Sequence, residues 1–334
     1  MKTRNRVSHF MPWLYGILTA CVLQACIKED RSDCGLNVQF RYTYNILDAD
    51  AFAQEADEVK LWVFDADNRL VAQYEEEGIR EIDNFQLHIP YLPAGEYSFV
   101  AWARSTDKQG EYADFELPEL NNGALMEELT ARLPRENDGT HRDRLNSLLN
   151  GTLKASVTGR LQTVTVDMMK CTHTLRIILM PMQGDKVMSA EDYHFRIEDK
   201  TGWLAYDASP YREDKVAYHP YYQEATSDPS ATDGETISSA LVAELNTSRL
   251  MTDAEPRLII SDAETGEEVM NLNLTWFLSL QAIGEHRAEW SDQEYLDRQD
   301  EYALTFFIDV DNNTWMKSHI VVNGWVVSLE EIEL

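Results

Sequence analysis

The chain has 334 residues, an aromatic content of 10% and a net charge of −29. So many acidic groups would repel phosphates, and so we expect no nucleic-acid partner. The aromatic content is far too high for a disordered chain. The length exceeds what one hydrophobic core usually supports, so we expect two folded domains.

The N-terminus has the features of a secretory signal. Lys2, Arg4 and Arg6 precede an uncharged, mostly apolar run over residues 10–25, which is shorter than the about 20 residues of a membrane-spanning helix. The run ends in Leu-Gln-Ala-Cys26, which resembles the lipobox of bacterial lipoproteins. The resemblance implies that residues 1–25 are removed and that lipid on Cys26 holds the protein in the outer membrane. The alternative is a plain N-terminal membrane anchor.

Residues 26–33 are predicted to form a lipidated, flexible tether. Lys28, Glu29 and Asp30 resemble the short signal that sends lipoproteins of the Bacteroidetes to the outer face of that membrane. The alternative is an ordinary polar tether. Residues 1–25 hold three of the 29 basic residues and none of the 58 acidic ones, so the remaining chain has a net charge near −32. Such a charge suits a protein that stays soluble at a crowded cell surface.

Two cysteines, Cys34 and Cys171, remain after the signal and the lipid site. In an oxidising compartment they could form a disulfide, which would close a long loop and contribute up to about 5 kcal/mol. The alternative is two separate thiols, with Cys171 buried, and the sequence leaves both open. No Cys/His spacing matches a zinc site, so we expect no metal.

Alternation with a period of two dominates the first half of the chain. Large apolar residues at 36, 38, 40, 42 and 44 alternate with polar ones, which predicts a half-buried strand. Further strands are predicted at residues 59–64, 70–74, 86–89, 97–103, 163–168 and 175–180. Leucines at four-residue spacing predict one or two short helices within residues 121–151.

The second half shows the same pattern. Strands are predicted at residues 193–197, 257–261, 270–276, 303–310 and 319–327, and a long surface loop at residues 207–235. Many short strands at this spacing favour β-sandwiches. We therefore predict an all-β protein with two tandem sandwiches, residues 34–172 and 173–334.

Several of these segments resemble one known family. The opening segment CGLNVQFRYTYN at residues 34–45, the segment VKLWVFD at 59–65 and the turn LPAGEYSFVAW at 92–102 are similar to the FimB-type fimbrial anchor lipoproteins of the Bacteroidetes. The segments YLDRQDEY at 295–302, FFID at 306–309 and IVVNGW at 320–325 match the closing strands of that family. The resemblance implies two transthyretin-like β-sandwiches and a surface protein that anchors a fimbria, or initiates or limits its assembly. It implies fimbrillins, the structural subunits of fimbriae, as partners.

In fimbriae of this type, a donor strand from one subunit fills a groove that a cleaved first strand has left in the next. If lipid remains on Cys26, the strand at residues 36–45 cannot be cleaved away, so we expect it to stay in its own sheet. The fimbrial contact would then lie elsewhere, and residues 320–334 are a candidate donor strand. The alternative is that these residues form an ordinary last strand.

The sequence contains no catalytic motif, so we expect neither an enzyme nor a cofactor. Residues 65–68 and 309–313 faintly resemble calcium loops but are better explained as hairpin turns. His173 and His194 are expected to be structural. A group of aromatic residues suggests an alternative function, carbohydrate binding by a surface lipoprotein of a glycan-uptake system. These residues are Trp203, Tyr206, Tyr211, Tyr218, Tyr221 and Tyr222.

Overall fold

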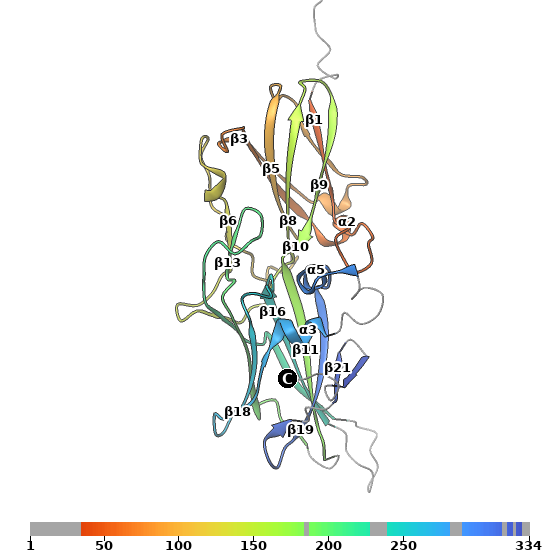
Figure 1. Cartoon of the computed structure of the whole chain (residues 1–334), viewed down its shortest axis with the longest axis vertical. Coiled ribbons are helices and arrows are strands. Elements are labelled where there is room, and N and C mark those ends of the chain that lie inside the picture. Colours follow the sequence, from red (N-terminus) through yellow and green to blue (C-terminus); the bar gives the residue numbers. More distant parts are fainter. Residues whose placement is uncertain are drawn as a thin grey trace, which may run out of the picture.

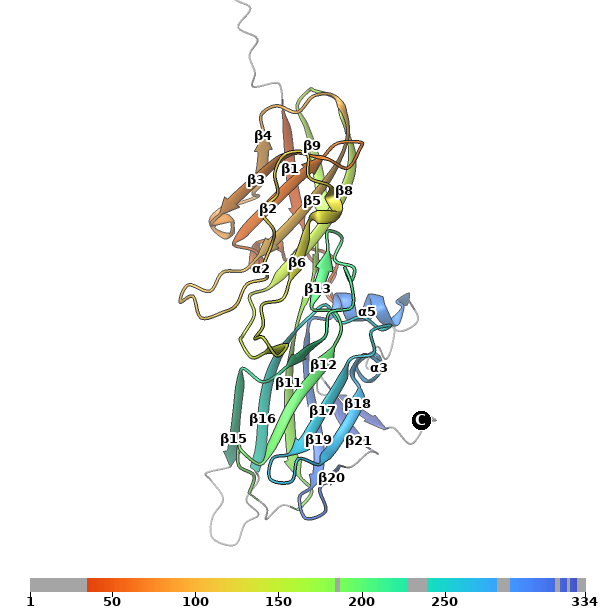
Figure 2. The same ribbon diagram turned by 90° about the vertical axis from the view of Figure 1, so that its left-hand side faces the viewer.

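The computed structural model describes residues 35–183, 187–227, 239–280 and 289–315, together with the backbone of β21 (His319–Val322) and β22 (Trp325–Ser328). The molecule is elongated and has two lobes (Figures 1 and 2). The N-terminal lobe contains the first strand and the C-terminal lobe the last ones. The described chain is mostly β-strand, which confirms the predicted fold class.

Two sheets form the N-terminal lobe. In the first, β1 (Leu36–Arg41) lies between antiparallel β4 (Gln86–Ile89) and parallel β9 (Gln162–Asp167). The second sheet has the order β10-β8-β5-β2-β3. Its strands are β10 (Met169–Lys170), β8 (Leu148–Val157), β5 (Gly95–Arg104), β2 (Glu58–Phe64) and β3 (Leu70–Glu77). Two short helical segments, α2 (Phe52–Glu55) and η2 (Ile79–Glu81), close one end.

The alternation predicted for the first strand is confirmed. Leu36, Val38, Phe40 and Tyr42 are all buried in the core between the two sheets. Tyr44 lies beyond the end of β1 and is only partly buried. The guanidinium carbon of Arg298 lies 4.4 Å from its ring centroid.

The helices predicted within residues 121–151 are mostly wrong. The one helical segment described there is the three-residue η3 (Met126–Glu128), and the last residues begin β8. Leu148 and Leu149 are both buried because β8 separates two apolar clusters, with one leucine in each. A strand that is buried on both faces loses the alternation of two, and so the four-residue spacing of Leu149 and Leu145 resembles one face of a helix.

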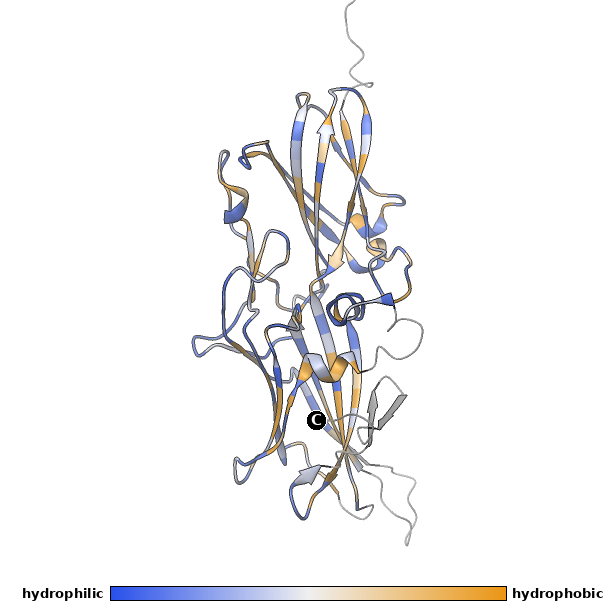
Figure 3. Cartoon of the chain, in the orientation of Figure 1, coloured by the Kyte–Doolittle hydropathy of each residue, from blue (hydrophilic) through white to orange (hydrophobic). Residues whose placement is uncertain are grey.

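The C-terminal lobe repeats the arrangement of the N-terminal lobe. Its first strand, β11 (Thr172–Pro181), lies between antiparallel β16 (Ser239–Ser248) and parallel β19 (Glu301–Asp309). β15 (Tyr222–Ser227) pairs with β16 and forms one edge of this sheet. β20 (Thr314–Trp315) and β21 pair with β19, and β22 pairs with β21 at the other edge. Hydrophilic and hydrophobic residues alternate along many of these strands (Figure 3).

A second sheet covers this one in the order β18-β17-β12-β14-β7. Its strands are β18 (Glu268–Asn273), β17 (Arg257–Asp262), β12 (Tyr193–Asp199), β14 (Val216–Tyr218) and β7 (Thr140–His141). A separate two-stranded sheet joins β6 (Thr130–Arg132) to β13 (Trp203–Ala205). Residues 207–235 were expected to be a loop, but they contribute β14, where Val216 and Tyr218 are buried, and β15, which pairs with β16.

The division of the chain at residues 172/173 stays a prediction. The backbone passes from one lobe to the other between β10 and β11, close to that point. However, β6 and β7 precede it in sequence and pair with strands that follow it. Among its described residues, the C-terminal lobe also contains the helices α3 (Leu274–Ser279) and α5 (Asp292–Arg298). Among the described residues, no helix has the length and apolar character needed to cross a membrane.

Candidate functional site: the lobe junction and the sheet edges

Helix α5 lies where the two lobes meet (Figure 1). The hydroxyl of Ser291 accepts a hydrogen bond from the backbone N–H of Glu294, which caps the helix, and acidic residues in its first turn suit the helix dipole. At its other end, Arg298 binds the N-terminal lobe. Its carbonyl accepts the N–H of Ile46 at 3.0 Å, and its guanidinium is 2.7 Å from the carboxylate of Asp48. The helix thereby joins the lobes.

Lys170 makes a second link across the junction. Its ammonium group is 2.9 Å from the carboxylate of Glu55 in the N-terminal lobe and also bonds Asp300, just before β19. Lys170 is only 9% exposed. Burial alone would lower the pKa of Lys170, but the charges of Asp300 and Glu55 raise it above its usual value. The lysine therefore stays protonated and holds both carboxylates.

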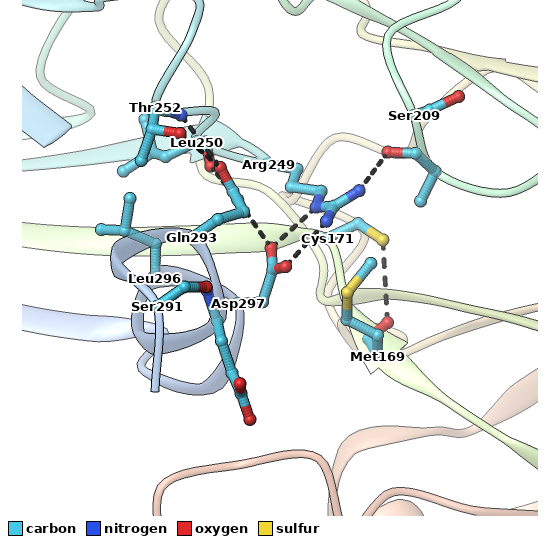
Figure 4. Close-up of polar contacts among 12 residues, drawn as sticks. Met169, Cys171, Ser209, Arg249, Leu250, Thr252, Ser291, Gln293, Leu296 and Asp297 are labelled. Carbon is cyan, nitrogen blue, oxygen red and sulfur yellow. Dashed lines mark hydrogen bonds and ion pairs between the residues drawn. The ribbon is translucent and has the colours of Figure 1, made fainter. Parts of the chain in front are cut away.

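The third contact, shown in Figure 4, lies on the C-terminal side of the junction. Arg249 donates two hydrogen bonds to the carboxylate of Asp297 on α5, at 2.8 and 2.7 Å, and a third to the carbonyl of Ala208. Gln293 donates to the same carboxylate at 3.0 Å. Burial alone would lower the pKa of Arg249, but the hydrogen bonds and charge of Asp297 raise it. This buried pair fixes α5 to the end of β16.

Cys171 is fully buried beside this pair (Figure 4). Burial raises the pKa of its thiol to about 12, so the thiol stays neutral. Its predicted partner, Cys34, lies outside the described residues, and so the disulfide stays a prediction.

His173 confirms the structural role expected for it. Its ring is fully buried, with Nε2 2.9 Å from the carbonyl of Leu296 on α5. Burial lowers the pKa of this histidine, which therefore remains neutral near pH 7. His194 lies in β12, opposite Ser261 of β17.

Several sheet edges are available for strand-based contacts. β3 is an edge of the N-terminal lobe, but its run of glutamates, Glu75–Glu77, would repel a partner as acidic as this chain. β15 and β22 are edges in the C-terminal lobe. The described backbone of the candidate donor segment forms the β21–β22 hairpin of its own sheet, and residues 329–334 lie outside the described residues.

One group of three acids, Glu58, Glu75 and Glu77, is close enough to hold a metal ion among the residues the structure describes. Two of its three carboxylates form ion pairs: Arg104 is 2.5 Å from Glu58, and Lys60 is 2.9 Å from Glu75.

Both calcium-like segments form turns. Asp65 Oδ1 accepts the backbone N–H groups of Asp67 and Arg69, in the turn between β2 and β3. Asp309 Oδ1 likewise accepts the N–H groups of Asp311 and Asn312, before β20. Carboxylate oxygens that bind their own backbone stabilise a hairpin, as the sequence had suggested.

Comparison with known families decides what kind of protein this is. The family model of the fimbrillin-A associated anchor proteins Mfa1 and Mfa2 matches residues 31–331. The chain belongs to this anchor family. The resemblance seen in the sequence is thereby confirmed, and the family associates the protein with fimbriae at the cell surface.

Solved structures agree with this family. A candidate polysaccharide-binding protein of Bacteroides thetaiotaomicron is 30% identical, with a TM-score of 0.74 over 90% of this chain and 100% of that chain. A candidate adhesin of the same species is 27% identical, with a TM-score of 0.75 over 89% and 98%. The fimbrial anchor protein Mfa2 of Porphyromonas gingivalis has the same fold, with 17% identity and a TM-score of 0.63 over 88% and 98%. A search of curated proteins found no significant match.

The junction contacts escaped the sequence analysis, because Lys170, Glu55 and Asp300 are far apart in the chain. The residues predicted for lipidation and export, Cys26, Lys28, Glu29 and Asp30, lie outside the described residues, and so their roles stay predictions.

Proposed function

We propose that this protein anchors a fimbria to the outer membrane through lipid on Cys26 and binds a fimbrillin with a strand of its C-terminal lobe. The observation that supports this most is the position of β1. It has a hydrogen-bonded strand on each side, β4 and β9, and its inward side chains are buried. A subunit that keeps its first strand has no empty groove there for a donor strand.

The two lobes then have different tasks. The N-terminal lobe follows the proposed lipid site and would remain near the membrane. The C-terminal lobe carries β15 and β22 at the two ends of its described sheet, each with a paired strand on one side, and such edge strands can extend a partner's sheet. The contacts of α5 and Lys170 would keep this lobe pointing away from the membrane.

A short C-terminal deletion tests where the fimbria binds. Removing residues 329–334 leaves β22 and its pairing with β21 intact, so the protein should still fold. If these residues donate a strand, most fimbriae should be shed into the medium, while the truncated lipoprotein remains on the cells. Electron microscopy of cells and immunoblots of medium measure this. Fimbriae that stay attached at wild-type length would eliminate the C-terminal donor.

A second prediction concerns display at the surface. Replacing Lys28, Glu29 and Asp30 with alanine should leave Cys26 lipidated but retain the protein on the periplasmic face, because the charges directly follow the lipid site. Protease treatment of intact cells reports exposure, and mass spectrometry of the mature N-terminus reports the lipid. Equal proteolysis of wild type and variant would leave residues 26–33 as a plain tether. An unmodified Cys26 in the wild type would contradict the lipid anchor itself.

A further inference from the structure

A groove of about 520 Å³ lies beside the junction, between the loops of the N-terminal lobe and the outer face of the C-terminal sheet. Arginines and tyrosines dominate its lining, although the chain as a whole carries a net charge of −29. They are Tyr112, Arg142, Arg144, Arg176, Tyr221 and Tyr222. Three acids, Glu111, Asp143 and Glu244, complete the lining. The groove thus combines cationic donors, aromatic rings and carboxylate acceptors.

Arg144 is the residue in this groove best placed to bind a ligand. Its guanidinium carbon lies 4.7 Å from the ring centroid of Tyr112 and 5.4 Å from that of Tyr221, so two aromatic rings hold it. It is exposed, and no carboxylate of the described residues forms an ion pair with it. A stacked guanidinium keeps its N–H edge free, and that edge matches the two oxygens of a carboxylate.

The other two arginines differ in how firmly they are held. Arg176 bonds Glu244, which also accepts the hydroxyl of Tyr221. This network positions the tyrosine that supports Arg144. Arg142 is 3.5 Å from Glu136, and both side chains are more than half exposed. Such a surface pair contributes little, so Arg142 is available to a bound anion.

The remaining lining narrows the class of ligand. Tyr222 is 44% exposed, which offers a ring face on which a sugar can stack. The acids of the groove can accept hydrogen bonds from hydroxyl groups, which a sugar has in number and the side chains of an acidic peptide lack. A polyhydroxylated ligand with one carboxylate can bind the arginines through that carboxylate, stack on the tyrosine ring and donate hydrogen bonds to the acids. We propose that this groove binds a carboxylated sugar, such as a sialic acid or a uronic acid at the end of a glycan.

This proposal extends beyond anchoring and is independent of it. It also differs from the aromatic group suggested by the sequence. Tyr218 of that group is buried, and Trp203 stacks with Arg212 at 4.1 Å outside the groove. Of the six aromatic residues, Tyr221 and Tyr222 line the groove.

Calorimetric titration of the purified protein at low salt tests the proposal. The probes are 3′-sialyllactose and galacturonic acid, with lactose and the methyl ester of galacturonic acid as uncharged counterparts. We expect saturable binding of at least one acid and at least tenfold weaker binding of its counterpart. Arg144→Ala should weaken binding about tenfold or more, because it removes a charged hydrogen-bonding group. Tyr222→Ala should weaken it severalfold.

Arg212→Ala is the matched control, because it removes another exposed arginine that stacks on an aromatic ring but lies outside the groove. It should bind the probe like the wild type. Circular dichroism of each variant checks folding. The proposal is overturned if neither acid binds, if acid and counterpart bind equally, or if folded Arg144→Ala binds like the wild type. A glutamate-rich peptide that binds more tightly than both sugars, and loses binding in Arg144→Ala, would overturn it in favour of a protein ligand.

Discussion

Replacing Arg249 with alanine is expected to lower the free energy of unfolding by about 3–5 kcal/mol. The change leaves the carboxylate of Asp297, whose side chain is 6% exposed, without its cation in the interior. Asp297 lies on α5, so the loss also loosens the helix that joins the lobes. Urea unfolding followed by circular dichroism measures the change.

A double replacement tests whether the cost of Arg249→Ala comes from leaving a buried charge without its partner. In Arg249→Met/Asp297→Leu no charge is left buried, so the double variant should be more stable than Arg249→Ala. Arg176→Ala is the control, because Arg176 is 59% exposed and its pair with Glu244 should contribute less than about 1 kcal/mol. If Arg249→Ala costs no more than Arg176→Ala, the pair does not stabilise the junction.

Replacing Phe40 with alanine should cost about 3–5 kcal/mol. Phe40 is 6% exposed in β1, and its ring stacks on Phe52 with centroids 5.4 Å apart and on Phe85 at 6.1 Å. The substitution leaves a cavity between the two sheets of the N-terminal lobe. This cost is comparable with much of the stability of an ordinary domain, and it measures how firmly the first strand is held. Thermal and urea unfolding report it.

Arg41→Ala is the matched control in the same strand. Arg41 is about half exposed and its partner, Asp167, is 64% exposed, so the change should cost less than about 1 kcal/mol. Equal effects of the two substitutions would mean that β1 contributes little to the core. β1 would then not be held firmly enough to block a donor strand.

The sequence predicted strands best where one face of the strand is buried and the other is solvated. β1 has this arrangement, and its alternation located both the strand and its inward residues. The prediction was wrong where both faces are buried, as at Leu149 in β8, because its neighbours then need not be polar: Leu148 lies in the other apolar cluster.

The contacts of the junction left no signal in the sequence. Lys170 meets Glu55 and Asp300 only after both lobes have formed, and each residue alone resembles an ordinary surface charge. In a chain with 58 acids, no pairing rule selects those two. The groove around Arg144 was missed for the same reason, since its lining comes from five separate parts of the chain. Such sites form only when residues that are far apart in the sequence meet in the folded protein, so local sequence patterns do not reveal them.

The direction of β1 has a mechanical consequence. The strand starts at the outer end of the N-terminal lobe and runs toward the junction, so a load between Gly35 and the C-terminal lobe acts along its axis (Figure 1). Its hydrogen bonds to β4 and β9 lie across that axis. They are therefore strained together in shear instead of opening one after another, so several must break at once before the strand slips. The rate of forced unfolding depends on the height of this barrier. β1 therefore resists the pulling force that drag on a long filament exerts.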